Sequence, residues 1–140
     1  MRPTRDQFPL FYPITTRWSD NDVYGHINNV VYYSYFDSIA NRFLIEEGGL
    51  DITSSAEIAF VVSSGCDYYQ PIAYPQAIEG GLAVEHLGRS SVRYRIGIFA
   101  TGAPEASVCG FFTHVFVKRD SQASCPIPEA IRSALSRLAP

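Results

Sequence analysis

The polar stretch SDNDVYGHINN, at positions 19–29, contains the side chains best suited to chemistry. Two aspartates come first, then a histidine and a pair of asparagines, and the residues that follow are mostly apolar or aromatic. A carboxylate beside a helix N-terminus can activate water or attack a carbonyl carbon, while free backbone N–H groups stabilise the oxyanion that forms. Asp22, seven residues before Asn29, is the candidate for this role.

The leaving group determines which acyl compounds such a site can cleave. A thiol, with a pKa of about 8.5, leaves readily, so a thioester needs neither a metal nor a complete catalytic triad. The sequence contains no GxSxG, HExxH, P-loop or GxGxxG motif, and we expect no metal site. Asp and Asn are also common in turns and helix caps that have no catalytic role, so spacing alone leaves both interpretations open.

Charge and cysteine content narrow the class of protein. The chain has 140 residues and a net charge of −3 without a long basic run, which indicates a single domain, 1–140, and argues against a nucleic-acid partner. Cys66, Cys109 and Cys125 lack metal-site spacing, so we expect free thiols in a reducing compartment. With no signal peptide and no apolar run of membrane-spanning length, the expected location is the cytoplasm, without a membrane partner.

Hydrophobic periodicity predicts one long helix within an antiparallel meander, in the order β-α-β-β-β-β with a short terminal helix. Asn28 or Asn29 is the expected N-cap of the long helix, and Gly48-Gly49 is expected to end it. The simplest fold for such a chain is α+β, with the sheet wrapped around the helix. The expected strands cover residues 11–18, 59–69, 77–87, 91–100 and 108–117, and the expected helices cover residues 30–47 and 128–138.

The long helix is apolar nearly all round, which predicts that it is buried. Asp37 lies within it, and because an unpaired buried charge is unfavourable, this carboxylate is expected to face a partner or a ligand. The last strand is apolar on both faces, and long antiparallel strands leave edges that pairing between subunits would cover. We therefore expect a homo-oligomer.

The pattern D-x-D-x-x-G-H-x-N-N from Asp20 to Asn29 resembles that of the 4-hydroxybenzoyl-CoA thioesterase family of hotdog-fold acyl-CoA thioesterases. The resemblance continues through YYQPIAYPQAIEGGLAVEHLGRSSVRYRI and HVFVKRDSQASCPIPEAIRSAL. It implies a hotdog fold, in which an antiparallel sheet wraps around one long buried helix, here with a short C-terminal helix. It also implies a homodimer or a homotetramer built from dimers, with active sites at the dimer interface.

The resemblance assigns catalytic roles within the polar stretch. Asp22 matches the catalytic aspartate, which acts as nucleophile or general base. The backbone N–H that polarises the thioester carbonyl maps onto Asn29. His26 has no single role across the superfamily, and we expect it to shape the site, with a part in catalysis left open.

The resemblance further implies a set of substrate contacts. Asp37 matches an acidic position near the acyl site, Asn28 belongs to the site motif, and Arg89 matches a turn that contacts CoA. An arginine there would pair with phosphate. The residues expected to bind substrate are Asp37, Asn28, Arg89, Ser90 and Ser91.

The leading hypothesis is an acyl-CoA thioesterase that releases free CoA and a carboxylic acid and needs no cofactor, CoA being part of its small-molecule substrate. Two alternatives remain open: a thioesterase acting on acyl carrier protein, and a non-catalytic acyl-CoA-binding module. A hotdog dehydratase is less consistent with the sequence, because the His-containing hydratase signatures are absent. The acyl group and the choice between nucleophilic and general-base catalysis are not determined by the sequence.

Overall fold

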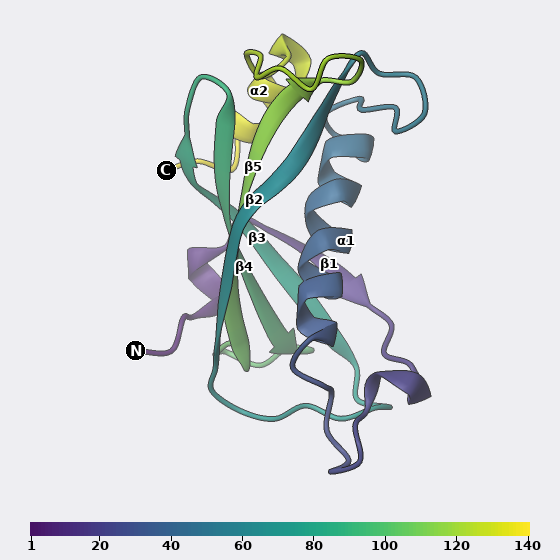
Figure 1. Cartoon of the computed structure of the whole chain (residues 1–140). Helices are drawn as coiled ribbons and strands as arrows, with labels where there is room; N and C mark the ends of the chain where they lie inside the picture. Colours follow the sequence, from purple (N-terminus) through teal and green to yellow (C-terminus); the bar gives the residue numbers. More distant parts are fainter.

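A five-stranded antiparallel sheet curves around one long helix in the computed structural model, which describes residues 1–140 (Figure 1). This is the α+β architecture predicted from the sequence. The elements in chain order are η1 (Arg5–Gln7), β1 (Leu10–Ile14), η2 (Trp18–Asp20), α1 (Val31–Glu46), β2 (Glu57–Tyr68), β3 (Ile78–Leu87), β4 (Ser91–Ala100), β5 (Val108–Lys118) and α2 (Glu129–Ser136), where η denotes a 3₁₀ helix.

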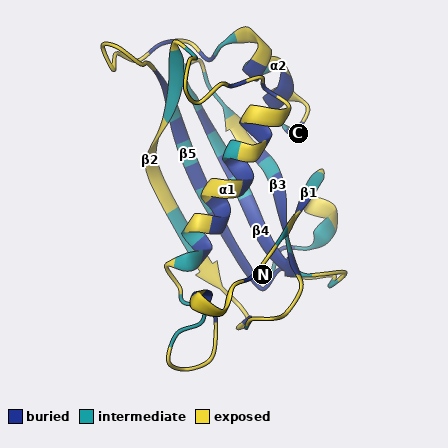
Figure 2. Cartoon of the chain, turned by 90° about the vertical axis from the view of Figure 1, so that its right-hand side faces the viewer, coloured by how far each residue is buried: buried dark blue, intermediate teal, exposed yellow.

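The strand order β1-β3-β4-β5-β2 places β4 at the centre and leaves β1 and β2 as the two edges. All neighbouring strands are antiparallel. Helix α1 lies across one face of the sheet, and the short α2 packs at the end where α1 finishes (Figures 1 and 2). The polar stretch that precedes α1 therefore lies at the opposite end of the sheet from α2.

Helix α1 is amphipathic rather than enclosed on every side. The side facing the sheet is buried, whereas the outer side is exposed, which Figure 2 shows as alternating dark blue and yellow along the helix. Polar residues such as Ser34 and Asn41 recur on the outer side, so the prediction of burial all round is wrong for that side. The buried residues are spaced by three or four positions, as a one-sided helix requires: Tyr32, Tyr35, Phe36, Ile39, Ala40, Phe43 and Leu44.

Asp37 lies on the exposed side of α1, contrary to its expected place in a buried helix. Its Oδ1 accepts a hydrogen bond of 3.0 Å from Asn41 Nδ2, one turn further along. Within the single chain this carboxylate is solvated and needs no buried partner.

Two glycines allow α1 to approach the sheet closely. A Cβ added at Gly80 on β3 would collide with Ile39 of the helix, and one at Gly110 on β5 would collide with Phe36. The helix ends as predicted at Gly48-Gly49, since Gly49 adopts a φ of +73° that favours glycine.

The first strand is shorter than the predicted 11–18. Its register with β3 ends at the pair formed by Ile14 and Ile78, so residues beyond Ile14 have no strand opposite them. Trp18 is instead the first residue of η2. Its side chain is 77% exposed, and its ring packs edge to face against the ring of Tyr74. The other strands and α2 differ from the predicted ranges by at most two residues at either end.

The core between α1 and the sheet contains two unpaired polar groups. His114 on β5 is 2% exposed and its Nδ1 has no hydrogen-bond partner, and the buried hydroxyl of Tyr94 on β4 has none either. The two rings meet edge to face, with centroids 5.2 Å apart. Burial lowers the pKa of His114 to about 4, although the charge of Asp37 acts in the opposite direction. The imidazole is therefore neutral at pH 7.

We expect acid to destabilise the protein through His114, by up to about 3 kcal/mol between pH 6.5 and pH 4. In this window the unfolded chain binds a proton at His114 that the folded chain does not, because the folded pKa is the lower one. Urea unfolding at several pH values would measure the effect, and His114→Phe should remove this part of the pH dependence. His86→Gln, which alters an exposed histidine of β3, is the matched control and should follow the wild type. Parallel curves for wild type and His114→Phe would contradict the prediction.

Candidate active site

The polar stretch folds into a small hairpin that leads into α1. Asn21 and Ile27 form an antiparallel bridge, and the Asp22 N–H donates to the His26 carbonyl at 2.8 Å. Gly25 makes the turn with a φ of +83°. These contacts fix Asp22 on the first arm of the hairpin, beside the second arm that becomes the helix.

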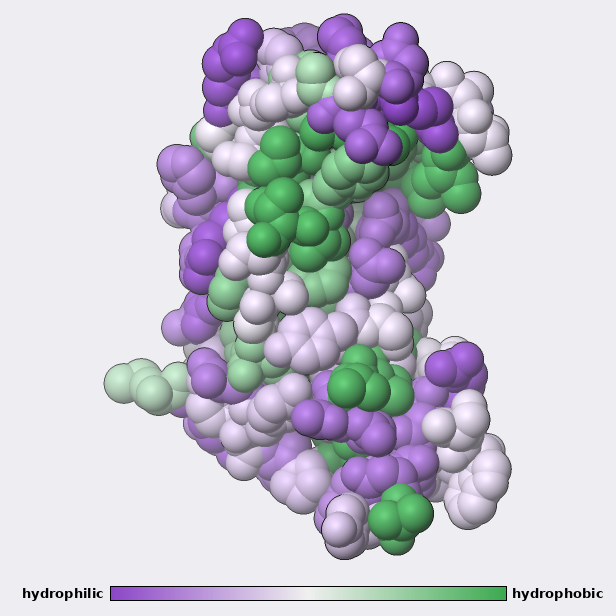
Figure 3. Space-filling model, in the orientation of Figure 1, coloured by the Kyte–Doolittle hydropathy of each residue, from purple (hydrophilic) through white to green (hydrophobic).

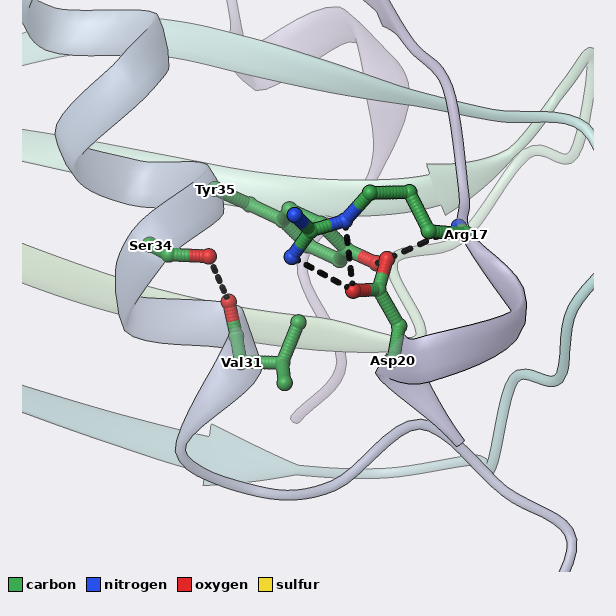
Figure 4. A network of polar contacts seen from close by, with 5 residues as sticks. All are labelled: Arg17, Asp20, Val31, Ser34 and Tyr35. Carbon is green, nitrogen blue, oxygen red and sulfur yellow. Dashed lines mark hydrogen bonds and ion pairs between the residues drawn. The ribbon is translucent and has the colours of Figure 1, made fainter. Parts of the chain in front are cut away.

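The two aspartates of the motif occupy different environments. The Asp20 carboxylate is fully buried and accepts hydrogen bonds from the Arg17 N–H, the Arg17 guanidinium and the Tyr35 hydroxyl at 2.7–3.0 Å (Figure 4). Burial by itself raises the pKa of Asp20, but the hydrogen bonds from Tyr35 and Arg17 outweigh burial and lower it. With both oxygens occupied, Asp20 is a structural anion.

The Asp22 carboxylate, in contrast, is available for chemistry. Its Oδ1 accepts a hydrogen bond of 2.9 Å from the Tyr24 N–H, and its Oδ2 makes none within the chain. Asp22 is half-buried, next to an open depression lined by Trp18, Tyr24 and Asn28. The structure therefore distinguishes an anchored aspartate from one with a free carboxylate oxygen.

Val30 occupies the N-cap position of α1 and makes no side-chain capping bond, so the prediction of Asn28 or Asn29 there is wrong. Asn28 lies two residues before α1 and accepts hydrogen bonds from the chain that enters the helix. Its Oδ1 accepts from the Val30 N–H at 3.1 Å and its carbonyl accepts from the Val31 N–H at 2.9 Å. The N–H of Asn29, between these groups, makes no hydrogen bond within the chain. This free donor at a helix N-terminus has the character expected of an oxyanion-binding group.

A cavity of about 280 Å³ is lined in part by Asn29, whereas Asp22 borders the separate depression beside Trp18. The Tyr68 hydroxyl, from the end of β2, donates to the Asn29 carbonyl at 3.3 Å. Burial raises the pKa of Tyr32 to about 12, so its phenol stays protonated. The cavity is lined by His26, Ile27, Asn29, Tyr32, Tyr68, Tyr69, Gln70 and Pro71.

The predicted CoA-contacting residues do not join this site within one chain. The Ser90 carbonyl accepts from the Phe116 N–H at 2.8 Å, and Phe116 pairs with Ala59 near the start of β2. Asn29 contacts Tyr68 at the far end of the same strand. Nine residues of extended strand separate the two ends, a distance of about 30 Å. The hairpin of Arg89, Ser90 and Ser91 thus lies at the other end of the sheet from Asp22.

Sequence reasoning missed three residues at or beside the site: Arg17, Tyr35 and Tyr68. Tyr35 was indistinguishable from the other aromatic residues of the helix, which pack in the core. The only signal for Arg17 was its place three residues before Asp20. No group of three or more His, Cys, Asp or Glu side chains is arranged to hold a metal ion.

The fold and the hairpin together define the class of protein. A curved antiparallel sheet around one long helix, preceded by an aspartate-bearing loop, is the architecture of the hotdog thioesterases. The chain belongs to the thioesterase-like superfamily, whose sequence profile matches residues 16–135. None of its helices has the length and apolar character needed to cross a membrane.

The chain is also similar to individual proteins. The chain is 52% identical to PA5185 of Pseudomonas aeruginosa strain PAO1, with a TM-score of 0.98 and coverage of 99% of this chain and 97% of that one. PA2801 of Pseudomonas aeruginosa, described as a candidate thioesterase, is 28% identical, with a TM-score of 0.81 and coverage of 89% and 96%. YsmA of Bacillus subtilis is 23% identical over 88 residues, which span 63% of this chain and 59% of YsmA.

Proposed function

We propose that this protein is an acyl-CoA thioesterase, with Asp22 as the catalytic carboxylate and the Asn29 N–H as oxyanion donor. The observation that carries the proposal is that one hairpin holds both an unoccupied carboxylate oxygen, on Asp22, and an unoccupied N–H, on Asn29 just before α1, with Asn29 lining a cavity. Membership of the thioesterase-like superfamily supports the same reaction class.

The chemistry follows from these two groups. The Asn29 N–H polarises the thioester carbonyl and stabilises the oxyanion of the tetrahedral intermediate. As general base, Asp22 takes a proton from water as the water oxygen attacks the carbonyl carbon, and returns it to the departing CoA thiolate when the C–S bond breaks. As nucleophile, Asp22 attacks the carbonyl carbon and expels the CoA thiolate, which gives a mixed anhydride; water then hydrolyses the anhydride to the carboxylic acid and the free Asp22 carboxylate. His26 and Tyr68 line the acyl cavity in either case.

We further propose that the working enzyme contains a dimer formed through β2. This edge strand has twelve residues without a partner on its outer side, and Phe60, Val61 and Val62 are 39%, 45% and 59% exposed. Figure 3 shows an apolar patch over the region where β2 lies in Figure 1. A long apolar edge of this kind pairs readily with another strand, and a second copy of the same edge offers a matching surface.

Dimerisation through β2 would complete the active site. Antiparallel pairing of two β2 strands brings the start of one β2 toward the end of the other. Arg89 and Ser90 of one subunit then lie at the same end of the assembly as Asp22 of its partner. We propose that this hairpin binds the CoA phosphates, while Asp37 and Asn28 lie on the acyl side. A tetramer of two such dimers is compatible with this arrangement.

Arg89→Ala is expected to raise KM for acyl-CoA about tenfold with little change in kcat, because the lost contact involves the remote nucleotide rather than the reacting carbonyl. An acyl-N-acetylcysteamine thioester, which lacks the nucleotide, should show no change in kcat/KM. Arg137→Ala removes an exposed arginine of the same charge and is the control. Equal losses on both substrates would rule out a role for Arg89 in CoA binding.

Hydrolysis of an acyl-CoA panel tests the proposed function directly. The panel includes short, medium and long aliphatic acyl-CoAs together with benzoyl, hydroxybenzoyl and phenylacetyl derivatives, with released thiol as the readout. Turnover of at least one member by folded protein is expected. Cleavage of acyl-carrier-protein thioesters but of no acyl-CoA would identify acyl carrier protein as the substrate. Binding of acyl-CoA without hydrolysis would indicate a non-catalytic binding module. The three free cysteines are consistent with a reducing compartment, and we propose the cytoplasm.

A further inference from the structure

A buried polar contact ties the active-site hairpin to the body of α1. The Tyr35 hydroxyl donates to Asp20 Oδ2 at 2.7 Å, and the two residues are 6% and 0% exposed. Figure 4 shows Tyr35 reaching from the helix to the short η2 turn, where Arg17 closes over the other side of the carboxylate. The contact joins segments that are fifteen residues apart in the chain.

Asp20 also holds both arms of the hairpin. Its carbonyl accepts the Asn28 N–H at 2.9 Å, and Asp22 follows two residues later on the same arm. Asn28 in turn accepts hydrogen bonds from the Val30 and Val31 N–H groups at the start of α1, next to Asn29 in the chain. A displacement of Asp20 would therefore move the catalytic carboxylate and the oxyanion donor relative to each other.

Tyr35 is better placed than Arg17 to anchor this aspartate. The Arg17 side chain is 68% exposed, so water competes for its guanidinium and salt screens the ion pair. The Tyr35 bond is buried and joins a neutral donor to an ionised acceptor, which makes it a strong and directional contact. Burial and the neighbouring Asp20 both raise the pKa of Tyr35, so its hydroxyl remains a donor.

We propose that Tyr35 and Asp20 are positioning residues that hold the Asp22 carboxylate and the Asn29 N–H in the relative positions that the reaction requires. The inference rests on the proposed thioesterase function and adds to it two residues that do not touch the substrate. Tyr35 acts through Asp20, and Asp20 acts through the backbone of the hairpin.

Tyr35→Phe removes the donor hydroxyl and keeps the ring, so the core stays filled. We expect kcat to fall about 10- to 100-fold while KM changes less than about twofold, because the register of the reacting groups is altered rather than substrate binding. Amide exchange measured by NMR should accelerate about tenfold or more at Asp22 and Asn28 and stay unchanged in β4. A loss of global stability would instead accelerate exchange in β4 as well.

Two further variants make the test specific. Tyr12→Phe removes the hydroxyl of another largely buried tyrosine, one that makes no hydrogen bond within the chain and is not enclosed, and should leave kcat and hairpin exchange unchanged. The double variant Asp20→Asn/Tyr35→Phe should be no slower than Asp20→Asn alone, since Tyr35 acts through Asp20. Additive losses, or unchanged exchange at Asp22 and Asn28 in Tyr35→Phe, would overturn the proposal. Faster hairpin exchange in a protein without any turnover would uphold the positioning role and reject only the thioesterase function.

Discussion

Replacing Asp22 by asparagine is expected to lower kcat for thioester hydrolysis by about 10²- to 10⁴-fold. An amide neither accepts a proton from water at neutral pH nor forms the mixed anhydride of the nucleophilic route. The substitution preserves the hairpin, because the amide oxygen can still accept the hydrogen bond that the Tyr24 N–H makes with Oδ1. Single-turnover release of CoA thiol from the best substrate of the panel measures the effect.

The controls for Asp22→Asn use other carboxylates of the chain. Asp120→Asn, in the exposed loop after β5, should leave kcat unchanged, and the thermal unfolding of Asp22→Asn should match the wild type. Asp67→Asn addresses the carboxylate nearest the end of β2. If Asp22→Asn keeps most of the activity and Asp67→Asn loses it, the catalytic role belongs to Asp67 instead.

Asp20 and Asp22 also show which features of the site the sequence alone can predict. The motif places both in one polar stretch, and the family resemblance, rather than spacing, singles out Asp22. The physical difference between them depends on Tyr35, fifteen residues after Asp20. Only the packing of α1 against the η2 turn brings that hydroxyl to one carboxylate and leaves the other free. Such a contact has no local signature, since Tyr35 shares its spacing with purely structural aromatic residues.

The fold was more predictable than the site, because hydrophobic periodicity and the residue preferences of turns depend on residues that are close together in the sequence. β4 matches its predicted range, and Gly49 ends the helix region as expected. The errors arise where a distant element decides the outcome. The period-two pattern of residues beyond Ile14 predicted a longer first strand, but β3 has no residues opposite that segment. Asp37 was expected in a buried helix, but no strand of this chain covers the outer side of α1.

Val62→Lys is expected to convert the proposed dimer into a monomer and lower kcat/KM by more than about 100-fold. Val62 is 59% exposed in the middle of β2, at the bulge in its pairing with β5. In a twofold dimer each substitution occurs twice, so two ammonium groups would approach each other across an apolar contact. Val62→Thr has nearly the same shape without the charge and should remain dimeric. Sedimentation velocity reports the mass, and a dimeric or fully active Val62→Lys protein would exclude this edge as the interface.

Mixing two inactive or weakened proteins tests whether the site is shared between subunits. A heterodimer of Asp22→Asn and Arg89→Ala chains has one site with both substitutions and one site with neither, provided that Asp22 and Arg89 come from different subunits. After unfolding and joint refolding at equal amounts, half of the dimers are mixed, so about a quarter of all sites are intact. Activity at low acyl-CoA concentration should therefore exceed the mean of the two separate preparations. If Asp22 and Arg89 instead served the same substrate within one chain, every site would carry one substitution and mixing would restore nothing. The 30 Å of β2 between the two ends of the sheet makes the shared arrangement the expected one.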